Sequence, residues 1–143
     1  MTTDDSNRRT PWHIWAVGIL TLLWNGSGAY TIMMAQAGRL ANVSAEEAAY
    51  YAAQPSWFVV VTDIALVAAV AAGVALLMRR RAAVWLFGLS LSAIVVTDVY
   101  DVAVGTSRTL ISQGAVVFAL TIAAIAVLQL LYASTMQRRA VLK

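Results

Sequence analysis

The sequence of 143 residues contains no cysteine, one histidine and two prolines, and only 12% of its residues are charged. The absence of cysteine excludes disulfides, thiol chemistry and cysteine-ligated metals or clusters. The single histidine, His13, has no acidic or cysteine partner at metal-ligand spacing, and the chain has no phosphate-binding glycine loop or nucleophile elbow. We therefore expect no enzymatic activity, no cofactor and no bound metal.

Hydrophobic residues, in contrast, make up 61% of the chain and gather in long runs. Four runs are each long enough for a helix to cross the ~30 Å hydrocarbon core of a bilayer. They lie at 14–35, 57–78, 83–103 and 111–133. The links between them are too short for a separate soluble domain or a nucleic-acid surface. The sequence therefore predicts an all-α protein, a single four-helix transmembrane domain over residues 1–143.

Basic residues are unevenly divided between the two sides that these helices would define. Eight fall on one side, namely Arg8, Arg9, Arg79, Arg80, Arg81, Arg138, Arg139 and Lys143, and Arg39 and Arg108 fall on the other. Basic residues accumulate on the cytoplasmic side of membrane proteins. This division predicts that both termini are cytoplasmic, with residues 1–13 and 134–143 as short segments outside the bilayer. Arg8 and Arg9 before an apolar run also resemble a signal peptide, but the run is longer than an ordinary signal core, and we expect the first helix to remain.

The link over residues 36–56 is the longest between two predicted spans. Ser44 and Glu47 have the spacing of a capping box, which predicts a short helix on the outer surface before Pro55. This helix either leads the chain into the second span or acts as a lid or docking surface.

The next link is much shorter and carries Arg79, Arg80 and Arg81. Such a short connection makes the flanking helices antiparallel neighbours. The three arginines either fix the link on the cytoplasmic side or bind anionic lipid head groups.

Acidic residues interrupt two of the apolar runs. The second contains Thr62 and Asp63, and the third contains Thr97, Asp98 and Asp101. Because a charged residue inside a bilayer usually faces protein or water, two interpretations are open. In one, Asp63 and Asp98 form an outward-facing cation or proton site, with hydrogen bonds from the two threonines and from Asn25, Tyr30 and Tyr100. In the other, which we favour, the carboxylates reach the outer interface or join helices and serve packing alone.

Small residues at helical spacing predict close contacts between helices. Ala65, Ala69 and Gly73 form such a stripe in the second run. In the first run, the sequence Leu-Trp-Asn-Gly-Ser-Gly-Ala-Tyr over residues 23–30 brings Gly26 and Gly28 next to Asn25. We expect this stretch to contact another helix, with Asn25 facing protein.

Taken together, several short motifs resemble those of a family of small four-helix bacterial inner-membrane proteins that are often labelled "sugar transporter". The motifs are Trp24-Asn25 with Gly28 and Tyr30, Gln36, Tyr50-Tyr51, Pro55-Ser56-Trp57, Leu76-Leu77 before Arg79-Arg80-Arg81, and Ser90-Leu91 with Tyr100. Members often have an acidic residue where this sequence has Ala29. The resemblance implies a bacterial inner-membrane location, and the label implies a sugar substrate that these residues do not strongly support.

These observations favour a small structural or accessory membrane protein that works as an oligomer or within a larger assembly. Its expected partners are membrane lipids and copies of itself or other membrane subunits, with no nucleic acid. The alternative is a small transporter or cation-coupled carrier that uses the acidic residues.

Overall fold

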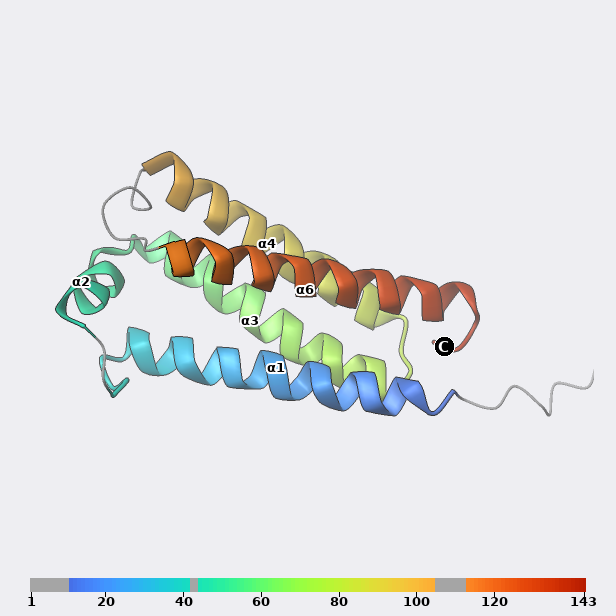
Figure 1. Ribbon diagram of the computed structural model, residues 1–143. Helices are drawn as coiled ribbons and strands as arrows, with labels where there is room; N and C mark the ends of the chain where they lie inside the picture. Colours follow the sequence, from blue (N-terminus) through green and yellow to red (C-terminus); the bar gives the residue numbers. More distant parts are fainter. Residues whose placement is uncertain (1–10, 42–43, 105–112) are drawn as a thin grey trace, which may run out of the picture.

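The computed structural model describes residues 11–41, 44–104 and 113–143, and within them the fold is all-α. The helices are α1 His13–Gln36, α2 Ala45–Ala53, α3 Ser56–Leu77, α4 Ala82–Val104 and α6 Gln113–Arg138. The four long helices lie along one direction, and α2 lies across the end opposite the C-terminus (Figure 1). Arg8, Arg9 and Arg108, which the orientation prediction also used, lie outside the described residues.

Three of the long helices are long and apolar enough to cross a membrane, not the four that we predicted. They are Ser56–Leu77, Ala82–Val104 and the Val116–Arg138 part of α6. With 24 residues, α1 is long enough as well. However, the polar and small residues of its 23–30 stretch lower its hydropathy. By length and composition, the structure therefore has three candidate spans.

Helix ends follow local signals in the sequence. The hydroxyl of Ser44 accepts the backbone N–H of Glu47 at 3.1 Å, and the Glu47 carboxylate accepts the Ser44 N–H at 2.9 Å, as the capping-box spacing predicts. At the ends of α1, α3 and α6, a residue with positive φ closes the last turn. These residues are Gly38, Arg79 and Ala140. Backbone bonds such as Arg80 N–H to the Ala75 carbonyl at 2.8 Å then satisfy the final carbonyl groups.

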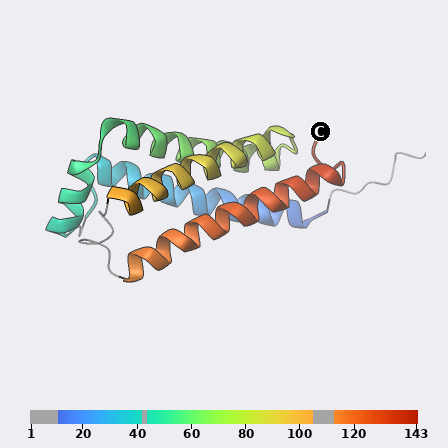
Figure 2. The same cartoon turned by 90° about the horizontal axis from the view of Figure 1, so that it is seen from above.

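The four long helices meet at the end away from α2. A buried cluster there takes residues from every long helix, including Ile14, Leu76, Phe87 and Met136. Toward α2, α6 separates from the other helices as it crosses them obliquely (Figure 2). The buried hydrophobic cluster of the described residues therefore lies at one end of the bundle.

The last residues of the chain, which we predicted as a short segment outside the bilayer, belong to this core. The helix α6 continues to Arg138, and Leu142 is only 1% exposed. The Lys143 N–H donates to the Arg79 carbonyl at 2.6 Å, and the Arg81 N–H donates to the Lys143 carbonyl at 3.0 Å. The residues after α6 are thus fixed against the α3–α4 turn.

Two glycines let α1 and α3 approach closely. A Cβ atom added at Gly18 would overlap the Leu77 side chain, and one at Gly73 would lie 2.8 Å from Cδ2 of Leu22. Each helix thus contributes a glycine that lies under a leucine of the other, and the two contacts are about one helical turn apart. Close backbone approach at small residues is the common way in which membrane helices pack.

We predict that Gly18→Ala destabilises the fold by roughly 1–3 kcal/mol, because the added methyl must displace Leu77. Gly88→Ala is the matched control, because nothing lies within 4 Å of the added Cβ there, and alanine favours a helix by up to about 1 kcal/mol. Unfolding in mixed detergent micelles, followed by circular dichroism, measures both. Equal stability of the two variants would show that α1 and α3 do not approach closely at Gly18.

Candidate functional site

The short helix α2 is tied to α4 by a hydrogen bond between side chains. The Tyr50 hydroxyl donates to Oδ2 of Asp101 at 3.0 Å. The Tyr50 ring also packs edge-on against Tyr51, with 5.3 Å between ring centroids. The carboxylate of Asp101, which we predicted as part of a polar site within the membrane, therefore accepts a bond from another helix.

The surroundings of Tyr50, Tyr51 and Glu47 on α2 shift the pKa values of these side chains. Burial raises the pKa of Tyr50, and the Asp101 carboxylate raises it further, so the hydroxyl keeps its proton and donates at neutral pH. Burial also raises the pKa of Tyr51, with a smaller contribution from Glu47. The hydrogen bonds from the backbone and hydroxyl of Ser44 lower the pKa of Glu47.

Aromatic rings join α3 and α4 next to this bond. Tyr100 packs edge-on against Trp57, with ring centroids 4.7 Å apart, and it also contacts Phe58, which is buried. Edge-to-face pairs of this kind contribute about 0.5–1.5 kcal/mol beyond the burial of their area. The rings therefore fix the depth at which Tyr100 and the neighbouring Asp101 lie.

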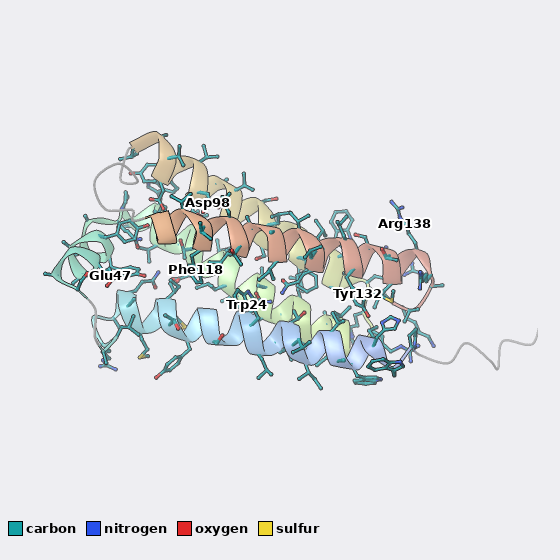
Figure 3. All side chains as sticks on the ribbon, in the orientation of Figure 1. Trp24, Glu47, Asp98, Phe118, Tyr132 and Arg138 are labelled. Atoms are coloured by element: carbon teal, nitrogen blue, oxygen red, sulfur yellow. The ribbon has the colours of Figure 1, made fainter. Side chains whose placement is uncertain are left out.

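Asp63 lies in a different place from Asp98. Asp63 lines a groove of about 470 Å³ between α1 and α3, together with Ala29, Gln36 and Leu66, and no lining residue comes from α4. Asp98 lies half-buried on α4, one turn before Asp101, at the end near α2 (Figure 3). The structure thus does not bring the two predicted carboxylates into one groove.

The threonine hydroxyl groups that we expected to support these carboxylates do not donate to them in the described part of the chain. The Thr97 hydroxyl contacts the backbone carbonyls of Ala93 and Ile94, at 3.2 and 2.9 Å. The Thr62 hydroxyl oxygen is buried and has no hydrogen-bond partner in the described part of the chain. The same holds for Oδ1 of Asp63 and Nε2 of Gln36. Two complementary polar groups, a carboxylate and an amide, therefore lie on one groove without partners among the described residues.

Two polar residues of α1 point in different directions. Asn25 points toward another helix, and Tyr30 points away from the bundle. The Asn25 amide donates to Oε1 of Gln129 on α6 at 3.4 Å, so Asn25 points toward protein. Tyr30 is 65% exposed and points outward. Hence these two residues of the predicted polar site do not share a pocket with Asp63.

Only some of the predicted packing residues lie at contacts between helices of this chain. Ala65 and Ala69 are buried, and Gly73 contacts α1. Gly26 and Gly28 have open space where a side chain would be, so neither is in close contact with another helix of this chain.

Two of the three arginines of the α3–α4 turn contact the end of the chain through their side chains. Nε of Arg79 donates to the Val141 carbonyl at 3.4 Å, and Nε of Arg81 lies 3.5 Å from the Leu142 carbonyl. Arg80 is exposed. Two of the three predicted head-group ligands therefore hold the end of the chain in place.

Sequence reasoning missed several residues that carry these contacts. His13 Nδ1 lies 2.6 Å from the Tyr132 hydroxyl and so connects the start of α1 to the end of α6. Gly18 and Leu142 were not singled out, and Gln36 and Tyr50 were named only among the motifs of the family resemblance. Tyr50 alone had a signal, since the capping box placed a helix with a tyrosine on the same predicted side as Asp98 and Asp101. No periodicity in the sequence marks the others.

The described residues contain no group of three or more histidine, aspartate or glutamate side chains that could hold a metal ion. Comparison with family models, curated proteins and solved structures gives no match. The class that the structure defines is thus an all-α protein with three helices able to span a membrane. The resemblance to small inner-membrane proteins stays a prediction.

We predict that Tyr50→Phe frees α2 from α4 while the long helices remain assembled, because it removes the hydroxyl that donates to Asp101. Hydrogen exchange in α2 should rise about tenfold, as expected for loss of ~1.5 kcal/mol from a bond to a charged group. Tyr51→Phe, in the same helix, is the control.

The pH dependence of this contact follows from the raised pKa of Tyr50. The stabilisation is fully present below the ordinary tyrosine pKa and is lost as the pH rises through the raised pKa. Alkaline pH should therefore release α2 in the wild type and have little further effect in Tyr50→Phe. Unchanged exchange in Tyr50→Phe at neutral pH would contradict the role of the bond.

Proposed function

We propose that the chain is an integral protein of a bacterial inner membrane in which α1 crosses the bilayer with the three more apolar helices. The support comes from exposed hydroxyl groups on α1. The Ser27 hydroxyl donates to the Trp24 carbonyl at 2.9 Å, and Thr31 donates to the Ser27 carbonyl at 3.0 Å. Ser92, Thr121 and Thr135 do the same on the other helices. Bonding within the helix satisfies a hydroxyl where water is absent.

The distribution of charge supports an orientation with both ends of the chain in the cytoplasm. Arg138 lies at the end away from α2, whereas Glu47 and Asp98 lie at or near the α2 end (Figure 3). The α3–α4 turn with its three arginines is at the Arg138 end, because the last residues of the chain pair with it. Basic residues prefer the cytoplasmic side, so α2 would lie on the outer face.

Within this membrane protein we propose a structural or accessory role, as a subunit of an oligomer or of a larger assembly. One observation carries it: two pairs of polar side chains join α1 to α6. They are Asn25 with Gln129, and Tyr132 with His13. Polar pairs of this kind contribute about 0.6 kcal/mol on average within a bilayer and fix how helices pack.

The surface that would meet a neighbouring subunit is the open side of α1 at Gly26 and Gly28. Neither glycine has an atom within 4 Å of an added Cβ, so a helix from another chain could approach the backbone closely. Ser27 and Tyr30 on the same stretch are exposed and could make polar contacts there.

We predict that Gly28→Leu reduces the mass of the assembly that is extracted in mild detergent, because leucine would separate the two backbones. Gly88→Leu on α4 is the matched control, since Gly88 also has open space around it. Size-exclusion chromatography with light scattering measures the mass, and circular dichroism checks that both variants fold. A wild-type chain that is monomeric and without partners would overturn the proposal.

A second candidate function, a small cation- or proton-coupled carrier, is favoured by the groove between α1 and α3. There Oδ1 of Asp63 and Nε2 of Gln36 are buried without partners in the described part of the chain. An unpaired buried polar group costs about 1–3 kcal/mol, and a bound ion or water would offset this cost.

If the protein is a carrier, Asp63→Asn should abolish proton or sodium flux into proteoliposomes, read with an entrapped pH- or sodium-sensitive dye. Asp98→Asn is the control, because Asp98 does not line the groove. Flux equal to that of protein-free liposomes in the wild type would exclude the carrier function and leave the accessory role intact.

A further inference from the structure

The groove between α1 and α3 is apolar except for two side chains, Asp63 and Gln36. Gln36 ends α1, and Asp63 lies in the half of α3 that follows α2, so the groove lies toward the α2 end of the bundle. Its volume of about 470 Å³ is many times the ~30 Å³ that one water molecule takes in the liquid. The groove therefore has room for a molecule much larger than water.

The polar atoms of this groove have no partners within the described residues. Oδ1 of Asp63 and Nε2 of Gln36 are buried without a hydrogen bond, so they are not bonded to each other either. No described arginine, lysine or histidine forms an ion pair with Asp63. Because a buried carboxylate needs a compensating positive charge, the groove favours a ligand that is a cation and carries N–H groups.

The rest of the lining is unsuited to a metal ion. Hard metal ions take several oxygen ligands. Among the side chains that line the groove, only Asp63 and Gln36 have oxygen atoms. The others are apolar, namely Ala29, Met33, Ala37, Leu66 and Val67. Such walls fit the hydrocarbon part of an organic cation.

From this chemistry we infer that the groove binds an organic ammonium ion with an apolar body and an oxygen acceptor near its nitrogen. The ammonium group donates to Asp63, the oxygen accepts from Nε2 of Gln36, and the apolar body lies against Leu66 and Val67. Free amino alcohols and the ethanolamine head group of a phospholipid both present this chemistry. The inference rests on the carrier candidate only in sharing its groove, because binding does not require transport.

Isothermal titration calorimetry of the full chain in detergent micelles, with empty micelles as the blank, tests the site. The probe is phenylethanolamine, which has an ammonium group, a hydroxyl group and an aromatic ring. Phenylethanol, which lacks the nitrogen, should bind about tenfold more weakly or less well still. Phenylethylamine, which lacks the hydroxyl, should bind about fivefold more weakly, as expected for one neutral hydrogen bond. A wild type that binds none of the three, or all three equally, would overturn the site.

Three variants locate the site, and circular dichroism checks that each folds. Asp63→Asn should weaken binding of phenylethanolamine about tenfold or more, because one charge-assisted hydrogen bond is lost. Asp98→Asn removes the same charge outside the groove and should leave the affinity unchanged. Gln36→Met has no N–H group, so the two amines should bind to it equally. Equal losses in Asp63→Asn and Asp98→Asn would overturn the site in favour of general attraction to acidic residues. A Gln36→Met variant that still distinguishes the two amines would overturn the contact with Gln36. The comparison of the three probes on the wild type tests the site even if a variant does not fold.

Competition with lipid distinguishes the two sources of the ammonium group. Displacement of phenylethanolamine by dioleoyl phosphatidylethanolamine, but not by dioleoyl phosphatidylglycerol, would support the site and assign it to a lipid head group. Displacement by neither lipid would support the site and assign it to a free amine. Equal displacement by both lipids would overturn the site, because acyl chains alone would then fill the groove.

Flux and assembly mass separate this inference from the proposed function. Binding of phenylethanolamine without proton or sodium flux would support the site and overturn only the carrier. Flux in a wild type that does not bind the probe would overturn the site and leave the carrier. A wild-type monomer that binds the probe would support the site and overturn only the accessory role.

Discussion

Backbone hydrogen bonds between the α3–α4 turn and the residues after α6 hold together the end at which all four long helices meet. The Lys143 backbone bonds to both Arg79 and Arg81, and this pairing places Leu142 inside the core. Without it, α6 would contact the bundle mainly through α4, because few of its side chains are buried. The position of α6 therefore depends on a short segment outside the apolar runs.

The opposite end is held by weaker and more polar contacts. There α2 is joined to α4 by the bond from Tyr50 to Asp101, and α3 meets α4 through the ring of Tyr100. A molecule with one packed end and one polar end is suited to a bilayer whose two faces differ. The packed end carries the arginines, and the polar end carries the acidic residues. Packing and charge thus follow the same axis.

Much of the fold could be predicted from the sequence, because apolar runs and the capping box are local signals. The predicted ends of the helices differ from the observed ones by one or two residues, except at Arg138, where α6 continues five residues further. The candidate site was less predictable. Whether Asp63 meets Asp98, or Gly18 meets Leu77, depends on how each helix is rotated about its axis. A membrane helix that is apolar on all sides has no polar face from which the sequence could predict that rotation. Hydropathy also could not show that Leu142 folds back into the core.

We predicted four spans, and three helices are apolar enough to be candidate spans. The difference arises from the way in which mean hydropathy is calculated. Mean hydropathy counts each polar residue against a span, whether or not that residue has a partner in the folded chain. On α1, Asn25 bonds to Gln129, while Ser27 and Thr31 bond to their own helix. A polar group that is already hydrogen-bonded costs much less to place in a bilayer than an isolated one. The stretch that lowers the hydropathy of α1 is therefore less costly in the bundle than in an isolated helix, and this lower cost supports the proposal that α1 lies in the membrane beside its three more apolar neighbours.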